Sequence, residues 1–326
     1  MGRTDAIRQL MSEMNSWKNI ELKVRSANKF VKIPPELANR PLYTHTDSTY
    51  IETAAGDRFL ETVNFLPDGN KTRYSSYFHD GRAATVGYDP KDSNVQTQVS
   101  ITRAFHREDR TGTNARPIPL SYFYIDKVPL YEALPKAEYL GEEAGKFGSC
   151  DKYLFKNVPL RSAHQDQIYY LDRATALPVR VDALGTTGAR KGQTLWSWTA
   201  TKVETIQDHP FAAESVTTLY KSGEDFKSVL STISYDVQSL RYDADLSSFA
   251  FWPTIAPGVR VENLITREST ITPGKPAIDP VKAATSTTTT PIVAEPPRDW
   301  TSILSYGGIA LGVAVLLAAF IAWRRR

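Results

Sequence analysis

The sequence predicts an α+β protein with a mostly antiparallel sheet, followed by an extended stalk and one C-terminal transmembrane helix. Three observations support this prediction: an opening segment with a helical hydrophobic period, a long succession of segments with a period of two, and an uncharged apolar stretch near the C-terminus. The chain has 326 residues, 41% of them hydrophobic, which allows one large domain or two ordinary ones and excludes wholesale disorder.

The cysteine count and the charge exclude further classes of protein. One cysteine cannot form an internal disulfide framework or a Cys-rich metal site. The formal net charge of +3 depends on three arginines at 324–326, because residues 1–267 carry 33 basic and 32 acidic side chains. A nearly neutral head lacks the basic face that a polyanion requires, so we expect no nucleic-acid partner.

The first element is predicted to be an amphipathic helix that opens the head. Either Thr4 or Asp5 is available as its N-cap. Its apolar side chains recur at steps of three and four residues: Ile7, Leu10, Met11, Met14 and Trp17.

After this helix the hydrophobic period changes to two, beginning with Ile20, Leu22 and Val24. Turn signals such as Asp80-Gly81 separate the segments that follow. We predict strands near 43–54, 57–66, 71–79, 82–88, 95–104, 121–127, 138–145, 150–157, 165–172, 177–184, 193–205, 213–222 and 228–241. Residues 130–137 form the second predicted helix, so the head is mostly antiparallel sheet with few helices.

The composition changes at residue 268. Between 268 and 299, prolines alternate with Thr, Ala and Ser, and no apolar period is present. This pattern is typical of a disordered, semi-rigid linker. We therefore predict a head at 1–267, a Pro/Thr-rich stalk at 268–299 and a C-terminal anchor at 300–326.

The anchor contains 21 uncharged residues, 303–323, which would span about 31 Å as a helix and so match a hydrocarbon core of about 30 Å. Trp300 and Trp323 suit the two membrane interfaces, and the arginines at 324–326 suit a cytoplasmic end. The predicted partner of residues 303–323 is therefore the lipid bilayer, with a single-pass topology.

The side of the membrane has two interpretations. The arginines place the C-terminus in the cytoplasm and the head outside, in the periplasm. The first residues contain no apolar export segment, so either the chain starts after a signal peptide or the protein is tail-anchored with a cytoplasmic head. We favour the first interpretation.

Two stretches late in the head carry a resemblance. Ile168-Tyr169-Tyr170-Leu171-Asp172 is followed by the strand Leu177-Pro178-Val179-Arg180-Val181, and the head closes with Asp245 to Pro253 and then Pro257 to Val261. Together with the opening helix and strand, this resembles the periplasmic lipoprotein-carrier (LolA-like) superfamily of outer-membrane lipoprotein-sorting proteins. The resemblance implies a strongly curved antiparallel half-barrel, packed on a few helices, that holds acyl chains or senses envelope state.

Alternation along the strands provides candidate binding residues for such an apolar concave face. If they share one face, these side chains either line a ligand cavity or form plain core beneath the first helix. They are Ile168, Tyr170, Val179, Val181, Trp196 and Trp198.

The sequence offers little for catalysis, and we predict no catalytic residue, no metal site and no cofactor. The five histidines lie far apart and lack metal-ligand spacing. Cys150 has the carboxylate of Asp151 beside it and no histidine within ten residues. The basic residues between Arg103 and Arg116 are interpreted as an ordinary exposed loop.

The predicted function is that of a non-enzymatic, membrane-anchored envelope protein whose head binds a lipid or acyl ligand, a lipoprotein or a protein partner, or senses envelope state. The main alternative is a ligand-free structural or protein-interaction module on the same stalk. An anchored hydrolase that uses Cys150 or dispersed His and Asp residues is the third hypothesis.

Overall fold

The computed structural model describes residues 2–31, 33, 42–103, 116–125, 128–160, 163–221 and 228–273. Most of these residues belong to strands and few to helices, which confirms the predicted predominance of sheet. Residues 274–299 of the predicted stalk and the predicted span 303–323 lie outside the described residues. None of the helices within the described ranges has the length and apolar character needed to cross a membrane.

The first half of the head begins with a helix and continues with six consecutive strands. Its elements are α1 (Arg3–Ser16), β1 (Ile20–Phe30), β2 (His45–Glu52), β3 (Arg58–Phe65), β4 (Lys71–His79), β5 (Arg82–Tyr88) and β6 (Gln96–Arg103).

The second half contains short helices and then a run of longer strands. Its first elements are η2 (Leu120–Phe123), β7 (Tyr124–Ile125), β8 (Val128–Pro129), α2 (Leu130–Ala133) and η3 (Leu134–Lys136). The longer strands are β9 (Glu138–Gly145), β10 (Gly148–Leu160), β11 (Ala163–Asp172), β12 (Pro178–Gly185), β13 (Thr194–Ile206), β14 (His209–Tyr220) and β15 (Val229–Arg241), with η4 (Gly188–Arg190) between β12 and β13. Two short strands, β16 (Arg260–Asn263) and β17 (Glu268–Ile271), end the described chain.

Fifteen strands form one sheet in the order β17-β16-β6-β5-β4-β3-β2-β1-β15-β14-β13-β12-β11-β10-β9. All neighbours are antiparallel except β16 and β6, which are parallel. The pairing of β1 with β15 joins the two halves, because β1 is the first strand in the chain and β15 is the last long one. The other strands from β1 to β15 mostly follow one another as hairpins, which explains why local turn signals locate them.

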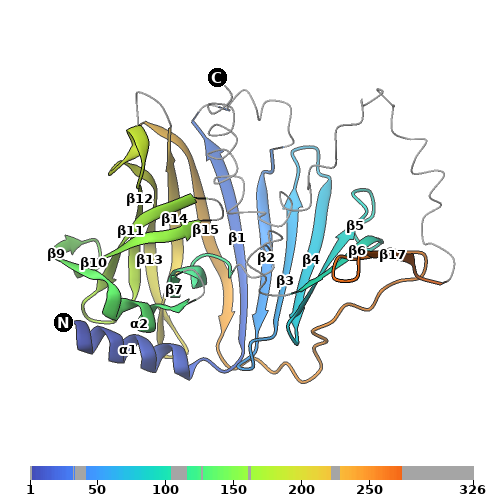
Figure 1. Ribbon diagram of the computed structural model, residues 1–326, viewed down its shortest axis with the longest axis horizontal. Coiled ribbons are helices and arrows are strands. Elements are labelled where there is room, and N and C mark those ends of the chain that lie inside the picture. The colour runs from blue at the N-terminus through green and yellow to red at the C-terminus, as the bar shows by residue number, and fades with distance from the viewer. Residues whose placement is uncertain are drawn as a thin grey trace.

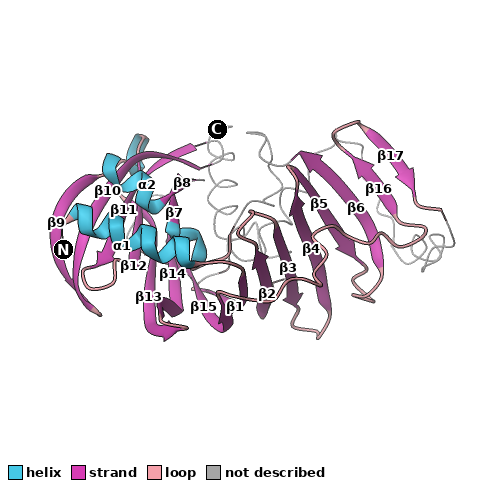
Figure 2. Ribbon diagram, turned by 90° about the horizontal axis from the view of Figure 1, so that it is seen from below, coloured by secondary structure: helices cyan, strands magenta, loops and turns pink. Residues whose placement is uncertain are grey.

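The helices cover one part of the sheet only. Figure 2 shows α1, α2 and the adjoining short elements over the β9–β14 side, whereas none of the described helices lies over β2–β6. Ala6, Leu10 and Met14 form the buried face of α1. The predicted N-caps Thr4 and Asp5 are both inside this helix, whose N-cap is Gly2 without a side-chain cap.

The sheet is open, which corrects the predicted strongly curved half-barrel. Its edge strands β9 and β17 lie at opposite ends of the molecule and do not pair with each other (Figure 1). A barrel of this many strands would enclose a wide interior. The described helices form one short layer that covers only the β9–β14 side and is too small to fill such an interior.

Two segments differ from the predicted elements. The predicted strand 121–127 begins as η2, and of its described residues, 121–125, Tyr124–Ile125 form a strand. Residues 268–271, which we assigned to the start of the stalk, form β17 and pair with β16. The ordered sheet therefore extends past the expected end of the head at residue 267.

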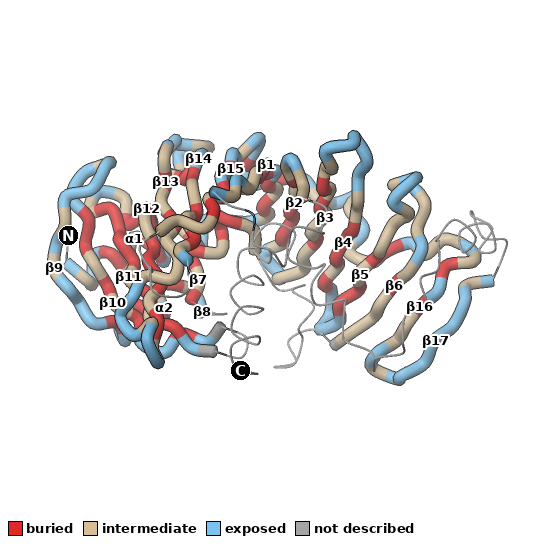
Figure 3. The backbone as a smooth tube through the Cα atoms, turned by 90° about the horizontal axis from the view of Figure 1, so that it is seen from above, coloured by how far each residue is buried: buried red, intermediate tan, exposed pale blue. Residues whose placement is uncertain are grey.

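The closing stretch of the head packs on the side of β3–β6 away from the helices. The ring of Phe249 lies 5.0 Å from that of Phe59, and Val259 joins Val86 and Val99 in a small apolar cluster. Figure 3 shows buried residues concentrated in the interior strands, whereas β9 and β17 are largely exposed. The apolar residues after 245 therefore help to cover this side of β3–β6.

Candidate functional site: the inner face of the sheet

The inner face is defined here as the face that the helices cover, and contacts of Tyr122 in η2 identify it. The ring centroids of Tyr122 and Trp198 lie 4.3 Å apart. The register places Val181 opposite Trp198 and Tyr169 opposite Val181, and directly opposite residues share a face. Tyr169 also donates a hydrogen bond of 3.3 Å to the carbonyl oxygen of Tyr124.

Four of the six predicted binding residues lie on this inner face. Trp198 is 0% exposed beneath Tyr122, and Trp196 donates from Nε1 to Oε1 of Gln165 at 3.2 Å. The space above the two tryptophans is therefore occupied by a packed ring. In this structure three of the four are buried in the core and Trp196, which is partly buried, packs against it, so that a binding role for them stays a prediction. They are Val179, Val181, Trp196 and Trp198.

Ile168 and Tyr170 lie on the opposite, outer face, which corrects the prediction that all six residues share one face. Ile168 pairs with Asp182, and Tyr170 pairs with Arg180. The Tyr170 hydroxyl donates to Oδ2 of Asp182 at 3.1 Å, and the Arg180 guanidinium lies 4.6 Å from the Tyr170 ring centroid. Because residues 168–171 are all apolar or aromatic, a period of two cannot identify their inward face. The inward residues of β11 are Gln165, Gln167, Tyr169 and Leu171.

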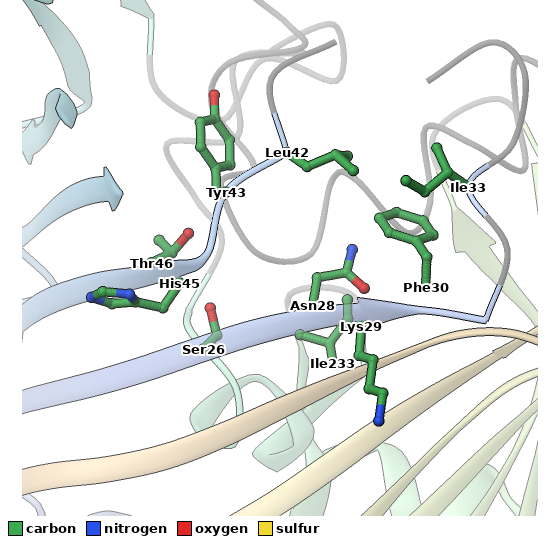
Figure 4. A pocket seen from close by; sticks show the side chains of 10 residues that line it. All are labelled: Ser26, Asn28, Lys29, Phe30, Ile33, Leu42, Tyr43, His45, Thr46 and Ile233. Carbon is green, nitrogen blue, oxygen red and sulfur yellow. The ribbon is translucent and has the colours of Figure 1, made fainter. Parts of the chain in front are cut away.

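A cavity of about 280 Å³ opens on the inner face where β1, β2 and β15 lie side by side (Figure 4). Its volume is close to the lower end of the range for small-molecule sites, roughly 300–1,000 Å³. Sequence reasoning missed its residues, because they come from three strands and from positions 33, 42 and 43, so that no local pattern unites them. The lining consists of Ser26, Asn28, Lys29, Phe30, Ile33, Leu42, Tyr43, His45, Thr46 and Ile233.

The side chains that enter the cavity are apolar or neutral. Figure 4 shows Asn28, Phe30 and Thr46 on the same side of the ribbon as Leu42 and Tyr43. Thr46 lies on the inner face because it is opposite Ser26, which is itself opposite Tyr235, and the Tyr235 ring is buried in the main core.

The side chains of Lys29 and His45, the lysine and the histidine of the cavity lining, lie on the outer face of the sheet. Lys29 follows Asn28 in β1 and extends to the opposite side of the ribbon (Figure 4). His45 precedes Thr46 and stacks on its cross-strand neighbour Phe65 with ring centroids 4.1 Å apart. Neither ionisable group therefore enters the cavity.

Asn28 supplies an unsatisfied polar atom at the cavity. Its Oδ1 atom is buried and has no hydrogen-bond partner among the described residues. The neighbouring Thr46 differs, because its hydroxyl donates to Oδ1 of Asn64 at 2.8 Å. A buried polar atom without a partner is costly, so a ligand that hydrogen-bonds to Asn28 would gain free energy there.

A charged network stands beside the cavity strands, at the end of β2. Glu52 accepts hydrogen bonds from Arg116 at 2.9 and 2.5 Å, from Arg58 at 3.1 Å and from the Tyr50 hydroxyl at 2.6 Å. The Arg116 guanidinium also lies 3.6 Å from the ring centroid of Tyr124. This network ties residues 116–124 to the sheet.

The network changes the acid–base behaviour of its members. Burial alone would raise the pKa of Glu52, but the hydrogen bonds and charges of Arg116 and Arg58 together lower it below its ordinary value. Burial and the nearby carboxylate raise the pKa of Tyr50. The Arg116 side chain is only 13% exposed, so the expectation that it belongs to an exposed loop is wrong for this residue.

The described residues offer Cys150 little nucleophilic reactivity. Cys150 is 2% exposed, and the pKa of its thiol is raised first by burial and then by the carboxylates of Asp172, Glu143 and Asp151. A raised pKa keeps the sulfur protonated, whereas a nucleophile must be a thiolate.

The four histidines within the described ranges, His45, His79, His164 and His209, do not assemble a site with one another. His79 contacts Asp57 at 2.9 Å, and His209 contacts Glu13 at 3.0 Å. No group of three or more His, Cys, Asp or Glu side chains in the described part of the chain is arranged to hold a metal ion. The hydrolase hypothesis therefore has no assembled constellation to build on within that part.

The chain matches no protein-family model and no curated protein. It is similar to a solved domain from Vibrio parahaemolyticus described as outer membrane lipoprotein-sorting, with 14% identity, a TM-score of 0.45 and coverage of 74% of this chain and 93% of that one. A DUF1329 family protein from Desulfovibrio piger has 13% identity, a TM-score of 0.45 and coverage of 76% and 96%. A LolA superfamily protein from Nitrosomonas europaea has 10% identity, a TM-score of 0.37 and coverage of 77% and 98%.

Proposed function

We propose that the head is a non-enzymatic binding module that holds an apolar ligand, a lipid or an acyl chain, in the cavity between β1, β2 and β15. The observation that carries this proposal is the lining of the cavity, where Phe30, Ile33, Leu42 and Ile233 surround a small polar group. Mostly apolar walls with a few placed polar atoms are typical of small-molecule sites.

The position of the cavity also supports binding rather than core packing. The aromatic rings of Trp196 and Trp198 are covered by Tyr122, whereas Ile33 at the cavity is 45% exposed. The cavity is therefore bordered by a solvent-exposed side chain, unlike the packed rings beneath η2.

Native mass spectrometry of the full chain tests this proposal. We expect copurifying acyl species on the wild-type protein and their loss in Ile233→Trp, whose larger side chain occupies the cavity. Ser234→Trp is the matched control, because Ser234 is the next residue of β15 and is exposed on the outer face. Absence of bound acyl species from the wild type, or equal binding by both variants, would contradict the proposal.

We further propose that the head is held at a membrane by residues 303–323, with the three arginines in the cytoplasm and the head in the periplasm. The length and apolar character of that stretch support this arrangement. Protease treatment of intact cells and spheroplasts tests it. Degradation of the head in spheroplasts is expected, and degradation only after lysis would favour the tail-anchored alternative with a cytoplasmic head.

A protein-interaction role is the second candidate, and the exposed edge of the sheet favours it. All four residues of β17 are exposed, and Ile271 at its end is 71% exposed. An edge strand offers unpaired backbone groups to an added strand. Ile271→Lys should abolish partner capture if this edge is used, and should leave lipid binding in the cavity unchanged.

A further inference from the structure

We infer that the cavity selects amphiphiles with a neutral hydrogen-bonding head, such as a hydroxyl or a carboxamide, over ligands with a charged head. This inference deepens the proposed function and rests on it, since it names the ligand class that the same cavity takes. It is carried by a row of neutral polar side chains, by Asn28, whose Oδ1 has no partner among the described residues, and by the placement of Lys29 and His45.

A row of neutral polar side chains crosses the inner face through the cavity. Consecutive register pairs connect its members across six neighbouring strands, β14, β15, β1, β2, β3 and β4. Directly opposite residues share a face, so the row is continuous. Its members are Ser215, Tyr235, Ser26, Thr46, Asn64 and Thr72.

Parts of this row and its surroundings are not satisfied within the described residues. Thr46 donates to Asn64, and Asn64 donates to Thr72 at 3.2 Å, so that end of the row is bonded. Oγ of Ser215 and Oδ1 of Asn28 are buried and have no partner among the described residues. Asn28 lines the cavity one step along β1 from the row, beyond Ala27, and can offer its amide to a ligand.

Among the residues that the structure describes around the cavity, a charged head would find no counter-charge. Lys29 and His45 are on the outer face, and the carboxylate of Glu52 is already bonded to Arg58 and Arg116. Removing an ion from water without a partner costs far more than burying a hydroxyl or an amide that makes its hydrogen bonds. The cavity therefore favours neutral heads by desolvation and by hydrogen bonding together.

A competition experiment on the full chain in lipid nanodiscs at pH 8 tests the inference. The reporter is 1-decanol that carries a diazirine at mid-chain. After illumination, the residues of the protein that it has labelled are located by peptide mass spectrometry. The competitors are 1-decanol, decanamide, decanoate and decylamine, compared at equal free aqueous concentration. We expect the two neutral competitors to displace the reporter at concentrations more than about tenfold lower than the two charged ones.

Variants at Asn28 test whether this residue causes the preference for neutral over charged heads. Asn28→Leu should weaken competition by decanamide about fivefold, the typical effect of one hydrogen bond. Asn28→Asp should invert the preference, with decylamine becoming the better competitor. Lys23→Met, on the exposed side of β1 and outside the cavity lining, is the control and should change neither preference. If Asn28→Leu loses its native circular dichroism, Thr46→Val provides the second test of the polar row.

The outcomes separate this inference from the proposed function. Equal competition by decanoate and 1-decanol, or a neutral preference that Asn28→Leu and Asn28→Asp leave unchanged, would overturn the inference while the proposed function stands. Absence of any labelling of the cavity residues would overturn the proposed function itself.

Discussion

Arg116 forms a two-point ion pair with Glu52, its Nε and Nη2 atoms lying 2.9 and 2.5 Å from the two carboxylate oxygens. The two side chains are 64 residues apart in the sequence and are 13% and 11% exposed. The pair fastens the segment that leads into η2, and so Tyr122, to the end of β2. Removing one partner would leave a buried charge without compensation.

We therefore expect Arg116→Ala to lower the free energy of unfolding by about 3–5 kcal/mol, measured by guanidinium denaturation at pH 7. Arg25→Ala is the matched control, because Arg25 also makes a two-point pair, with Asp47, but both side chains are well exposed. Arg25→Ala should lower the midpoint of guanidinium denaturation much less than Arg116→Ala does. An equal loss of unfolding free energy in both variants would show that burial of the Glu52 network adds nothing to the stability of the fold.

The lowered pKa of Glu52 makes the stability depend on pH. A carboxylate whose pKa is lower in the folded than in the unfolded state stabilises the fold above its unfolded pKa, about 4.3. This contribution is lost as the pH falls through the folded pKa. We expect Glu52→Gln to be less stable than wild type at pH 7 and to show a flatter decline in unfolding free energy between about pH 5 and 3. Parallel pH profiles for the two proteins would contradict this account.

The burial of Cys150 predicts an unreactive thiol. Since burial and three nearby carboxylates raise its pKa, the native protein should react with a disulfide reagent such as DTNB at least about a hundredfold more slowly than the guanidinium-unfolded chain at pH 8. Rapid stoichiometric labelling of the native protein would instead point to an accessible thiolate and revive the hydrolase hypothesis.

Substitution of Trp198 distinguishes a role in core packing from a role in ligand binding. It is fully buried against Tyr122, so Trp198→Ala should cost about 3–5 kcal/mol of unfolding free energy. Because Trp198 does not line the cavity between β1, β2 and β15, the affinity of the folded variant for 1-decanol should match that of wild type. Loss of ligand affinity in a variant shown to be folded would favour the binding face predicted from the sequence.

The sequence locates most long strands because local alternation and turn residues determine them. The predicted strands 57–66 and 177–184, for example, differ by only one residue at each end from β3 and β12. The two short strands β16 and β17 were missed. β16 pairs in parallel with β6, more than 150 residues earlier in the chain, and a non-local partner leaves no local period.

The candidate site was less predictable, for reasons that particular residues make clear. Ile168 and Tyr170 were assigned to the wrong face, because inward glutamines at 165 and 167 conceal the alternation of β11. Arg116 follows a basic run that is typical of exposed loops, and only the fold brings it to Glu52. The cavity lies where β1 pairs with β15, so its lining depends on contact between two strands that are more than 200 residues apart in the sequence.

The most direct test of the central claim is to locate a bound apolar ligand in the full chain. The photolabel of diazirine-bearing 1-decanol should map to residues at the cavity such as Phe30, Leu42 and Ile233, and should disappear in Ile233→Trp but persist in Ser234→Trp. Labelling at Trp196 and Trp198 instead, or labelling that Ile233→Trp leaves intact, would contradict a ligand site between β1, β2 and β15.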